Sequence, residues 1–112
     1  MGSTTPKRFE IILAGLDPVI GSEMTKTRPA VVVSADEMNA ALETVVVCPF
    51  TTKLHPKWRS RVQITTKGAR AEIAIDQIRT ISKQRVIRRL DTLSSKASSE
   101  VRRTISEMFG DG

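Results

Sequence analysis

The sequence predicts a mainly β domain, in which a small, strongly curved, barrel-like antiparallel sheet is followed by one C-terminal α-helix. Three observations support this prediction. Short apolar and β-branched runs recur along the chain, polar loops and turn residues separate them at hairpin spacing, and one amphipathic stretch closes the sequence. This spacing excludes alternating βαβ units. At 112 residues the chain (1–112) is expected to be a single domain with its core at about residues 7–109.

The expected strands are apolar or alternating runs that end at loop formers. Pro29 lacks a backbone donor and is therefore expected to open the second strand, after a loop at 17–28 that begins with Asp17-Pro18. The second and third strands are continuous apolar runs and are predicted to be buried on both faces. Lys67-Gly68 predicts a hairpin turn between the fourth and fifth strands. The strands are expected at residues 7–16, 30–34, 44–50, 60–66, 70–77, 78–81 and about 86–90.

Helical segments are expected in three places. Residues 35–42 contain helix formers and predict a short helix or turn, and 82–93 is expected to hold a helical turn before the last strand. The C-terminal helix is the clearest, because Ser94 can cap it and Gly110 can end it. Its apolar stripe predicts core packing and consists of Ala97, Val101, Ile105, Met108 and Phe109.

Composition limits the partners and the chemistry. The chain carries 18 Lys and Arg against 12 Asp and Glu, a net charge of +6, which favours a polyanionic partner such as nucleic acid or an acidic protein segment. No apolar run approaches the ~20 residues that span a bilayer, so no membrane partner is expected. A single cysteine fits a reducing cytosol, and Cys48 lies in an apolar run that predicts a buried thiol. One histidine and one cysteine cannot supply a zinc cage, so no metal site is predicted.

One reaction suits a chain with no Walker or Rossmann glycine pattern and with only His55, in a polar loop, available for a catalytic triad. When the neighbouring ribose 2′-hydroxyl cleaves RNA, the substrate contains the nucleophile, so the protein orients it, moves protons and stabilises charge on phosphorus. Arg28 lies where a loop meets a strand and offers a bidentate guanidinium. Thr51 and Thr52 follow a buried strand, and Glu23 is the carboxylate nearest to Arg28 in the sequence that suits proton transfer. Taken alone, each of these residues is more often an ordinary feature of a loop or strand end.

Four stretches together resemble the MazF/PemK/Kid toxin family, the mRNA interferases of bacterial toxin–antitoxin pairs. They are LDPVIGSE at 16–23, TRPAVVVS at 27–34, VVVCPFTT at 45–52, and AIDQIRTI followed by SKQRVIRRL at 74–90. Each stretch is weak evidence alone, whereas the four in this order and spacing are specific, and the resemblance covers about residues 7–109. It implies a CcdB/PemK-like, SH3-like barrel that forms a homodimer, acts in the bacterial cytoplasm and needs no cofactor.

The resemblance also implies a function: a sequence-specific, metal-independent endoribonuclease toxin that cuts single-stranded mRNA and so inhibits translation and growth. Such enzymes leave a 2′,3′-cyclic phosphate and a 5′-hydroxyl. Carried onto this chain, the catalytic residues are Arg28, Thr51 and Glu23, with Asp76, Thr52 and Ser22 in support. RNA-binding side chains are expected at Lys26, Lys53, Lys57, Trp58, Arg59, Arg61, Gln77 and Arg79. The implied partner besides RNA is a cognate antitoxin whose acidic, disordered tail crosses the RNA groove, which fits the basic composition.

Some features depart from the family or leave alternatives open. Some members carry an arginine two positions before the aspartate of the DQ pair, where this chain has Ala74, so Arg79 or Lys53 is the candidate to supply positive charge beside Asp76. Trp58, the only tryptophan, is a candidate to stack on an RNA base, although packing at a strand start explains it equally well. Two other functions fit the same fold: a gyrase-binding toxin, or a non-catalytic module that binds RNA or an antitoxin.

Overall fold

The computed structural model describes residues 5–16 and 27–110. Within these residues the chain forms a mainly β fold with a C-terminal helix, which confirms the predicted fold class. The strands are β1 (Glu10–Gly15), β2 (Thr27–Val32), β3 (Thr44–Thr51), β4 (Arg61–Thr66), β5 (Ala69–Ala74), β6 (Arg79–Ser82) and β7 (Val86–Thr92). The helices are α1 (Asp36–Ala41) and α2 (Ser95–Phe109), and the 3₁₀ turns η1 (Ile75–Gln77) and η2 (Lys83–Arg85) flank β6.

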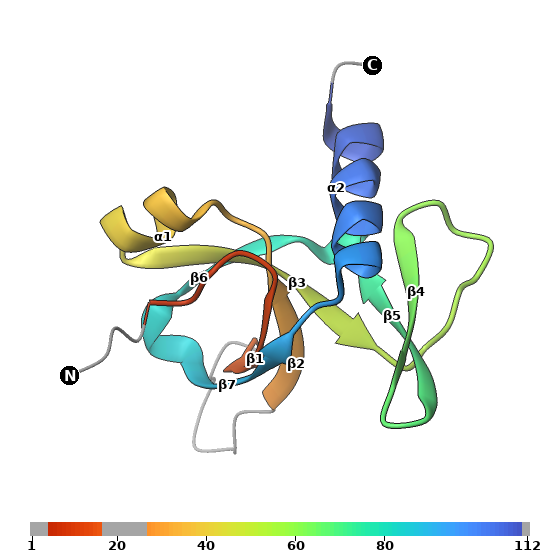
Figure 1. The fold of residues 1–112 in the computed structure, drawn as a ribbon, viewed down its shortest axis with the longest axis horizontal. Helices are drawn as coiled ribbons and strands as arrows, with labels where there is room; N and C mark the ends of the chain where they lie inside the picture. Colours follow the sequence, from red (N-terminus) through yellow and green to blue (C-terminus); the bar gives the residue numbers. More distant parts are fainter. Residues whose placement is uncertain (1–4, 17–26, 111–112) are drawn as a thin grey trace, which may run out of the picture.

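The strands form one curved antiparallel sheet in the order β4-β5-β3-β2-β1-β7, and β6 pairs with β3 off this path. Strand β3 is central because it pairs with β6 along its first half, with β2 near its middle and with β5 at its last two residues. A strand that changes partners along its length bends the sheet around itself. Figure 1 shows the result, with α1 and the β4–β5 hairpin at opposite ends of the sheet and α2 standing beside that hairpin.

Two clusters of apolar side chains lie on opposite faces of the central strands. Val31 and Cys48 belong to the cluster that packs against α2, whereas Val32 and Val47 belong to the other. Alternate residues of β2 and β3 therefore reach different clusters, which explains why both strands are continuous apolar runs. The prediction that these strands are buried on both faces is confirmed. Cys48 is fully buried, as expected, and burial followed by the charge of Asp76 raises the pKa of its thiol to about 12.

Several strand boundaries differ from the sequence prediction, and three of the differences have a clear physical reason. Phe9 has a φ of 68°, in the left-handed region, so the first strand begins only at the following residue. Pro29 lies inside β2 rather than at its start, where it pairs with Leu13 of β1. The pairing of β2 with β3 begins only at Ala30, so Pro29 has an open side on which its missing N–H breaks no ladder bond. Residues 75–77, predicted as the end of a strand, form the turn η1 and direct Asp76 and Gln77 outward.

The turn and the helix ends follow the predicted chemistry. Lys67 and Gly68 both have positive φ, as a tight two-residue hairpin turn requires. The Ser94 hydroxyl accepts a hydrogen bond from the backbone N–H of Ala97 at 3.2 Å, which caps α2. Gly110 follows the helix, and a Cβ there would come within 2.4 Å of the Ser106 carbonyl oxygen.

The apolar stripe of α2 packs largely as predicted. Ala97 and Val101 are buried in the core, and Ile105 packs against it. Thr104 is also buried, and its hydroxyl is satisfied by the carbonyl of Glu100. The last two members of the stripe are exceptions, because Met108 is half-buried outside the core cluster and Phe109 is exposed at the end of the helix. In the parts of the chain that the structure describes, neither helix is long and apolar enough to cross a bilayer.

Candidate functional site

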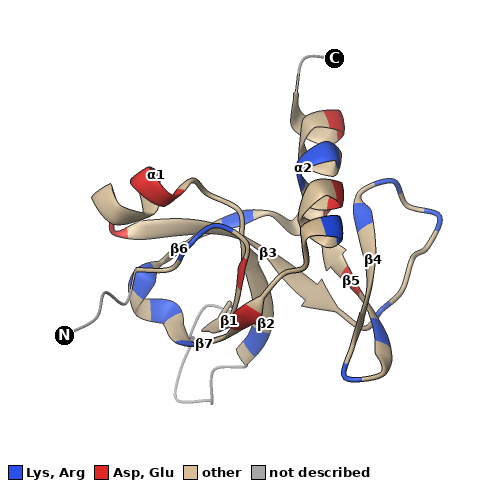
Figure 2. Ribbon diagram, in the orientation of Figure 1, with Lys and Arg blue, Asp and Glu red and all other residues tan. Residues whose placement is uncertain are grey.

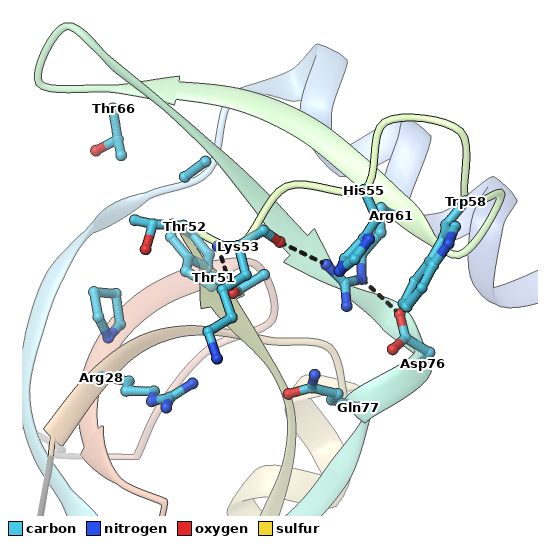
Figure 3. Close-up of a pocket in the computed structure, with 13 residues that line it drawn as sticks. Arg28, Thr51, Thr52, Lys53, His55, Trp58, Arg61, Thr66, Asp76 and Gln77 are labelled. Atoms are coloured by element: carbon cyan, nitrogen blue, oxygen red, sulfur yellow. Dashed lines mark hydrogen bonds and ion pairs between the residues drawn. The ribbon is translucent and has the colours of Figure 1, made fainter.

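A cleft of about 900 Å³ opens where β2, β3, the 52–60 loop and η1 meet. Its lining combines basic, hydroxyl-bearing, aromatic, acidic and apolar side chains (Figure 3). The residues that line it are Arg28, Pro29, Phe50, Thr51, Thr52, Lys53, His55, Trp58, Arg61, Thr66, Ala71, Asp76 and Gln77. Two segments that the sequence singled out, at 27–34 and 45–52, therefore meet in one site.

Strand register explains how Arg28 and Thr51 come together. In the β2–β3 pairing Ala30 lies opposite Pro49. Arg28 is two residues before Ala30, and Thr51 is two residues after Pro49, so both extend the same antiparallel register to the same edge of the sheet. Side chains two residues apart on a strand point to the same face of the sheet, so Arg28 lies on the face of Ala30 and Thr51 on the face of Pro49. Because Ala30 and Pro49 are opposite each other, Arg28 and Thr51 lie on the same face, and both line the cleft.

Thr51 is held in a geometry that suits an anion. Its Oγ1 accepts a hydrogen bond from the backbone N–H of Lys53 at 3.1 Å. Because the hydroxyl oxygen is already an acceptor, its own proton remains available to donate to a ligand in the cleft. Figure 3 shows the Arg28 guanidinium, the Lys53 ammonium group and the Gln77 amide around the same open space. The arrangement offers two positive charges and several hydrogen-bond donors to a phosphate.

The wall opposite Arg28 contains a network of charged groups centred on Arg61. The Arg61 side chain is only 4% exposed, and it donates to Glu72 and to Asp76, each at 2.9 Å. The Glu72 side chain is completely buried and also accepts from the backbone N–H of His55 and from the amide of Gln63. Among the described residues, no buried side-chain polar atom lacks a partner, so the network is fully satisfied.

Both carboxylates of this network are ionised at neutral pH. Burial alone would raise the pKa of Glu72, but hydrogen bonds from the His55 backbone, Gln63 and Arg61 outweigh it and lower that pKa below its ordinary value. Burial alone would likewise raise the pKa of Asp76, but hydrogen bonds from Arg61 and Ser60 outweigh it, so this pKa is also lowered. A lowered pKa makes Asp76 a weak base, so the structure favours a role in holding neighbouring groups over one in accepting a proton.

Arg61 lines the cleft, and it also makes contacts that were not expected for it. Its basic sequence neighbours predict a contact with RNA, and Arg79 or Lys53 was the expected positive charge beside Asp76. In the structure Arg61 itself pairs with Asp76, and its guanidinium is committed to two carboxylates. Sequence reasoning missed this role because Arg61 and Glu72 lie on different strands of the β4–β5 hairpin and their pairing depends on its register.

His55 and Trp58 form a stacked pair in the cleft wall. Their ring centroids are 3.8 Å apart and the planes differ by 9°, while the Arg61 guanidinium carbon lies 4.7 Å from the centre of the Trp58 ring. Trp58 remains 48% exposed. From the sequence His55 is only a histidine of a polar loop, and the one signal that could have identified it is its spacing of three residues from the only tryptophan.

The other residues expected at the site fall into three groups. Thr52, Lys53, Asp76 and Gln77 line the cleft together with Arg28 and Thr51. The exposed side chains of Lys57, Arg59 and Arg79 are not part of its lining, and Arg59 lies 3.8 Å from Glu107 of α2. Glu23, Ser22 and Lys26 lie outside the described residues. In the ranges 5–16 and 27–110, no group of three or more His, Cys, Asp or Glu side chains is arranged to hold a metal ion.

Comparison with known proteins links this cleft to one family. The family described as "PemK-like, MazF-like toxin of type II toxin-antitoxin system" matches residues 7–109. Endoribonuclease MazF of Staphylococcus saprophyticus is 33% identical over 109 residues, which cover 93% of this chain and 91% of that protein. The match includes all the described residues that line the cleft.

Solved structures show the same fold. MazF of Deinococcus radiodurans (crystal form I) is similar with a TM-score of 0.78 and 21% identity, covering 97% of this chain and 100% of that one. MazF in a MazE–MazF complex from the same organism (crystal form II) has a TM-score of 0.80 at 20% identity, covering 98% and 100% of the two chains. At these identities the likeness concerns the fold, and it agrees with the curved sheet and C-terminal helix described above.

Proposed function

Because the chain belongs to the family of PemK-like, MazF-like toxins of type II toxin–antitoxin systems, we propose that it is a sequence-specific, metal-independent endoribonuclease that cuts single-stranded mRNA. Family membership and the 33% identity to an endoribonuclease MazF support endoribonuclease activity. The observation that carries the finer proposal is that Arg28 and Thr51, from two different strands, line one cleft at the same sheet edge. Inhibition of translation and growth follows from cutting mRNA in the cytoplasm.

The proposed reaction uses a nucleophile that the substrate supplies. The ribose 2′-oxygen attacks the adjacent phosphorus and loses its proton, the bond from phosphorus to the 5′-oxygen breaks, and that oxygen takes up a proton. The products are a 2′,3′-cyclic phosphate and a 5′-hydroxyl. Since no water needs to be activated for this step, the reaction does not require a metal-bound hydroxide.

Four polar side chains of the cleft have a proposed role in this step. The Arg28 guanidinium is proposed to stabilise the charge that grows on the non-bridging phosphate oxygens and to donate a hydrogen bond to the leaving oxygen. Thr51 donates its hydroxyl proton to one of the same oxygens, and Lys53 and Gln77 hold the neighbouring phosphate and ribose. Glu23 is proposed to move the proton of the 2′-hydroxyl, because arginine stays protonated and the Asp76 carboxylate is a weak base.

The charge distribution supports two polyanionic partners. Figure 2 shows acidic residues on α1 and residues of both signs on α2, whereas the charged residues that mark β2, the β6–β7 region and the β4–β5 hairpin are mainly basic. We propose that this basic side binds RNA and, in its absence, the acidic segment of a cognate antitoxin. The relative from Deinococcus radiodurans is itself found in a MazE–MazF complex. The active form is proposed to be a homodimer.

Cleavage of a long RNA by the purified protein in EDTA tests the proposal. The wild type is expected to cut at a repeated short sequence, and Arg28→Ala and Thr51→Ala are each expected to lower the rate about 10²–10³-fold, the size typical of losing one oxyanion donor. Thr51→Ser keeps the hydroxyl and should retain most of the activity. Arg103→Ala removes the same charge as Arg28→Ala from an exposed site on α2 and serves as the matched control.

The other outcomes separate the rival functions. RNA that is retarded in a gel but not cut would indicate a non-catalytic RNA-binding module. Neither binding nor cutting would favour a gyrase-binding toxin, to be followed by a supercoiling assay. Full activity of Arg28→Ala would contradict the mechanism even if the wild type cuts RNA.

A further inference from the structure

A fully buried carboxylate lies directly behind the cleft and is not used in the proposed reaction. Glu72 lies on β5, with Thr51 of β3 on one side of it and Gln63 of β4 on the other. Its side chain is 0% exposed. Burying an ionised carboxylate is costly unless donors surround it, and here both oxygens receive them.

The donors tie an irregular loop to the hairpin. The backbone N–H of His55 points at both carboxylate oxygens of Glu72, at 3.0 and 2.8 Å. Arg61 binds the same carboxylate and also donates to the Lys53 carbonyl at 3.2 Å. Within the loop, the Trp58 N–H donates to the His55 carbonyl and the Arg61 N–H to the Trp58 carbonyl. Glu72 therefore holds the 52–60 loop directly at His55 and, through Arg61, at Lys53.

This loop carries the flat aromatic surface of the cleft. His55 and Trp58 are stacked and both line the cleft, and Trp58 is half exposed. Stacking on an aromatic side chain is a general way to hold an unpaired nucleobase. In Figure 3 this stacked pair and the Arg28–Thr51 edge lie on opposite sides of the open space, so a nucleobase on one side would place its phosphate toward the other.

The network suits positioning better than stability. A buried ion pair contributes little net stability compared with apolar side chains of the same volume, because the cost of removing both charges from water offsets the attraction between them. Its advantage is directional, because a carboxylate shared by donors from Arg61, Gln63 and the His55 backbone fixes where each of them lies. We propose that Glu72 is a positioning residue of the substrate cleft, which holds the 52–60 loop so that the His55–Trp58 pair receives a nucleobase beside the catalytic edge. The substrate part of this inference rests on the proposed function.

Glu72→Gln tests the positioning role without RNA. The glutamine keeps the shape of the glutamate side chain but replaces one carboxylate oxygen by an N–H₂ group. The donors from His55, Arg61 and Gln63 then face a donor where they need an acceptor. Trp58 is the only tryptophan, so its fluorescence reports this loop alone. We expect native circular dichroism together with at least about a twofold larger acrylamide quenching constant, because loss of the stack exposes the second face of the ring. The matched control is Glu37→Gln, an exposed residue of α1, which should leave quenching unchanged. Unchanged quenching in folded Glu72→Gln would overturn the proposal.

A second measurement needs no variant and remains decisive if Glu72→Gln fails to fold. The backbone amide of His55 should exchange with deuterium as slowly as amides in the sheet, although it lies in a loop, because the buried carboxylate holds it. Exchange at the rate of an open loop would overturn the proposal.

Cleavage kinetics then test whether positioning serves the substrate. Glu72→Gln should raise KM for RNA about tenfold, the order expected from losing one base stack, with kcat changed much less. In a Trp58→Ala background, Glu72→Gln should raise KM little further, because both substitutions remove the same aromatic surface. If Glu72→Gln instead acted through a general loss of structure, its effect on KM would be the same in both backgrounds. Additive effects would overturn the proposal. If the wild type does not cut RNA, the proposed function fails, while quenching and exchange still decide whether Glu72 holds the loop.

Discussion

Replacing Asn39 with aspartate tests a buried polar anchor that joins the N-terminal segment to the central strands. Asn39 of α1 is completely buried. Its amide nitrogen donates to the carbonyls of Pro6 and Ser34, each at 3.1 Å, and its amide oxygen accepts from the Ser34 hydroxyl. That hydroxyl in turn accepts from the backbone N–H of Val46 at 3.0 Å. One amide therefore connects residues from four parts of the chain.

The structure sets the size of the effect. Asn39→Asp keeps the volume but replaces the donor by an oxygen, so two buried carbonyls lose their partner and face a negative charge at 3.1 Å. Leaving a buried acceptor unsatisfied costs about 1–3 kcal/mol each, which sums to about 2–6 kcal/mol at neutral pH before the charge is considered. Against a total of about 5–15 kcal/mol for a domain, the variant should be severely destabilised.

The pH dependence distinguishes this mechanism from simple loss of packing. Burial and the facing carbonyls raise the folded-state pKa of the introduced carboxyl above its unfolded value. The folded state then binds more protons than the unfolded state, so the cost of Asn39→Asp shrinks as the pH falls below that raised pKa. Asn39→Ala loses the same contacts without a charge, and its cost should not change with pH.

Urea unfolding followed by far-UV circular dichroism, at equal protein concentrations at pH 7 and pH 4.5, measures these costs relative to the wild type. A cost of Asn39→Asp below about 1 kcal/mol at pH 7, or one that grows as the pH falls, would contradict the role assigned to these buried hydrogen bonds.

Three further predictions concern the site and its surroundings. Because the pKa of Glu72 is lowered in the folded state, the stability that this carboxylate contributes is present above its ordinary pKa and is lost as the pH falls through the lowered value. Acid unfolding of Glu72→Gln should therefore depend less on pH below about 4.3 than that of the wild type, and equal slopes would contradict this. Cys48 is buried with a pKa of about 12, so native protein at pH 8 should not react with a disulfide reagent until a denaturant is added, and prompt reaction would contradict the burial. Arg28→Lys keeps the charge but loses the planar fork, so its RNA cleavage rate should fall well below that of the wild type and remain above that of Arg28→Ala, whereas wild-type activity would show that charge alone is sufficient.

Features that depend on local chemistry could be predicted from the sequence. Continuous β-branched runs identified the two central strands, because alternate side chains of such a run reach opposite faces of a sheet. The Lys67-Gly68 turn and the Ser94 cap were also predicted, since each depends on conformations available to a few residues. Arg28 and Thr51 were singled out at the ends of two strands, and the structure places both residues in one cleft.

Features that depend on which strands meet could not be predicted in the same way. Glu72 is one charged residue in an apolar alternation, a pattern typical of a solvent-facing position, and its burial follows only once Arg61, Gln63 and the His55 N–H surround it. Arg61 was assigned to RNA for the same reason: its sequence neighbours are basic, while its partners lie across the hairpin. The start of β2 was also mispredicted, because Pro29 was expected to be the first residue of the strand. The strand begins at Thr27, since residues 27–29 pair with β1 alone and the missing N–H of Pro29 is tolerated there.

The outer position of β7 has a consequence for the protein at high concentration. Among the described strands β7 pairs only with β1, so no strand of the described residues covers the backbone groups on its other side. Such an edge can recruit the same edge of another molecule and start aggregation. Arg88 and Arg89 are both exposed on β7, but Arg89 is ion-paired with Glu10 of β1. Two copies meeting along this edge would therefore bring chiefly their Arg88 guanidinium groups together. This repulsion opposes runaway sheet growth, so neutralising these charges should lower the concentration at which the protein remains dispersed.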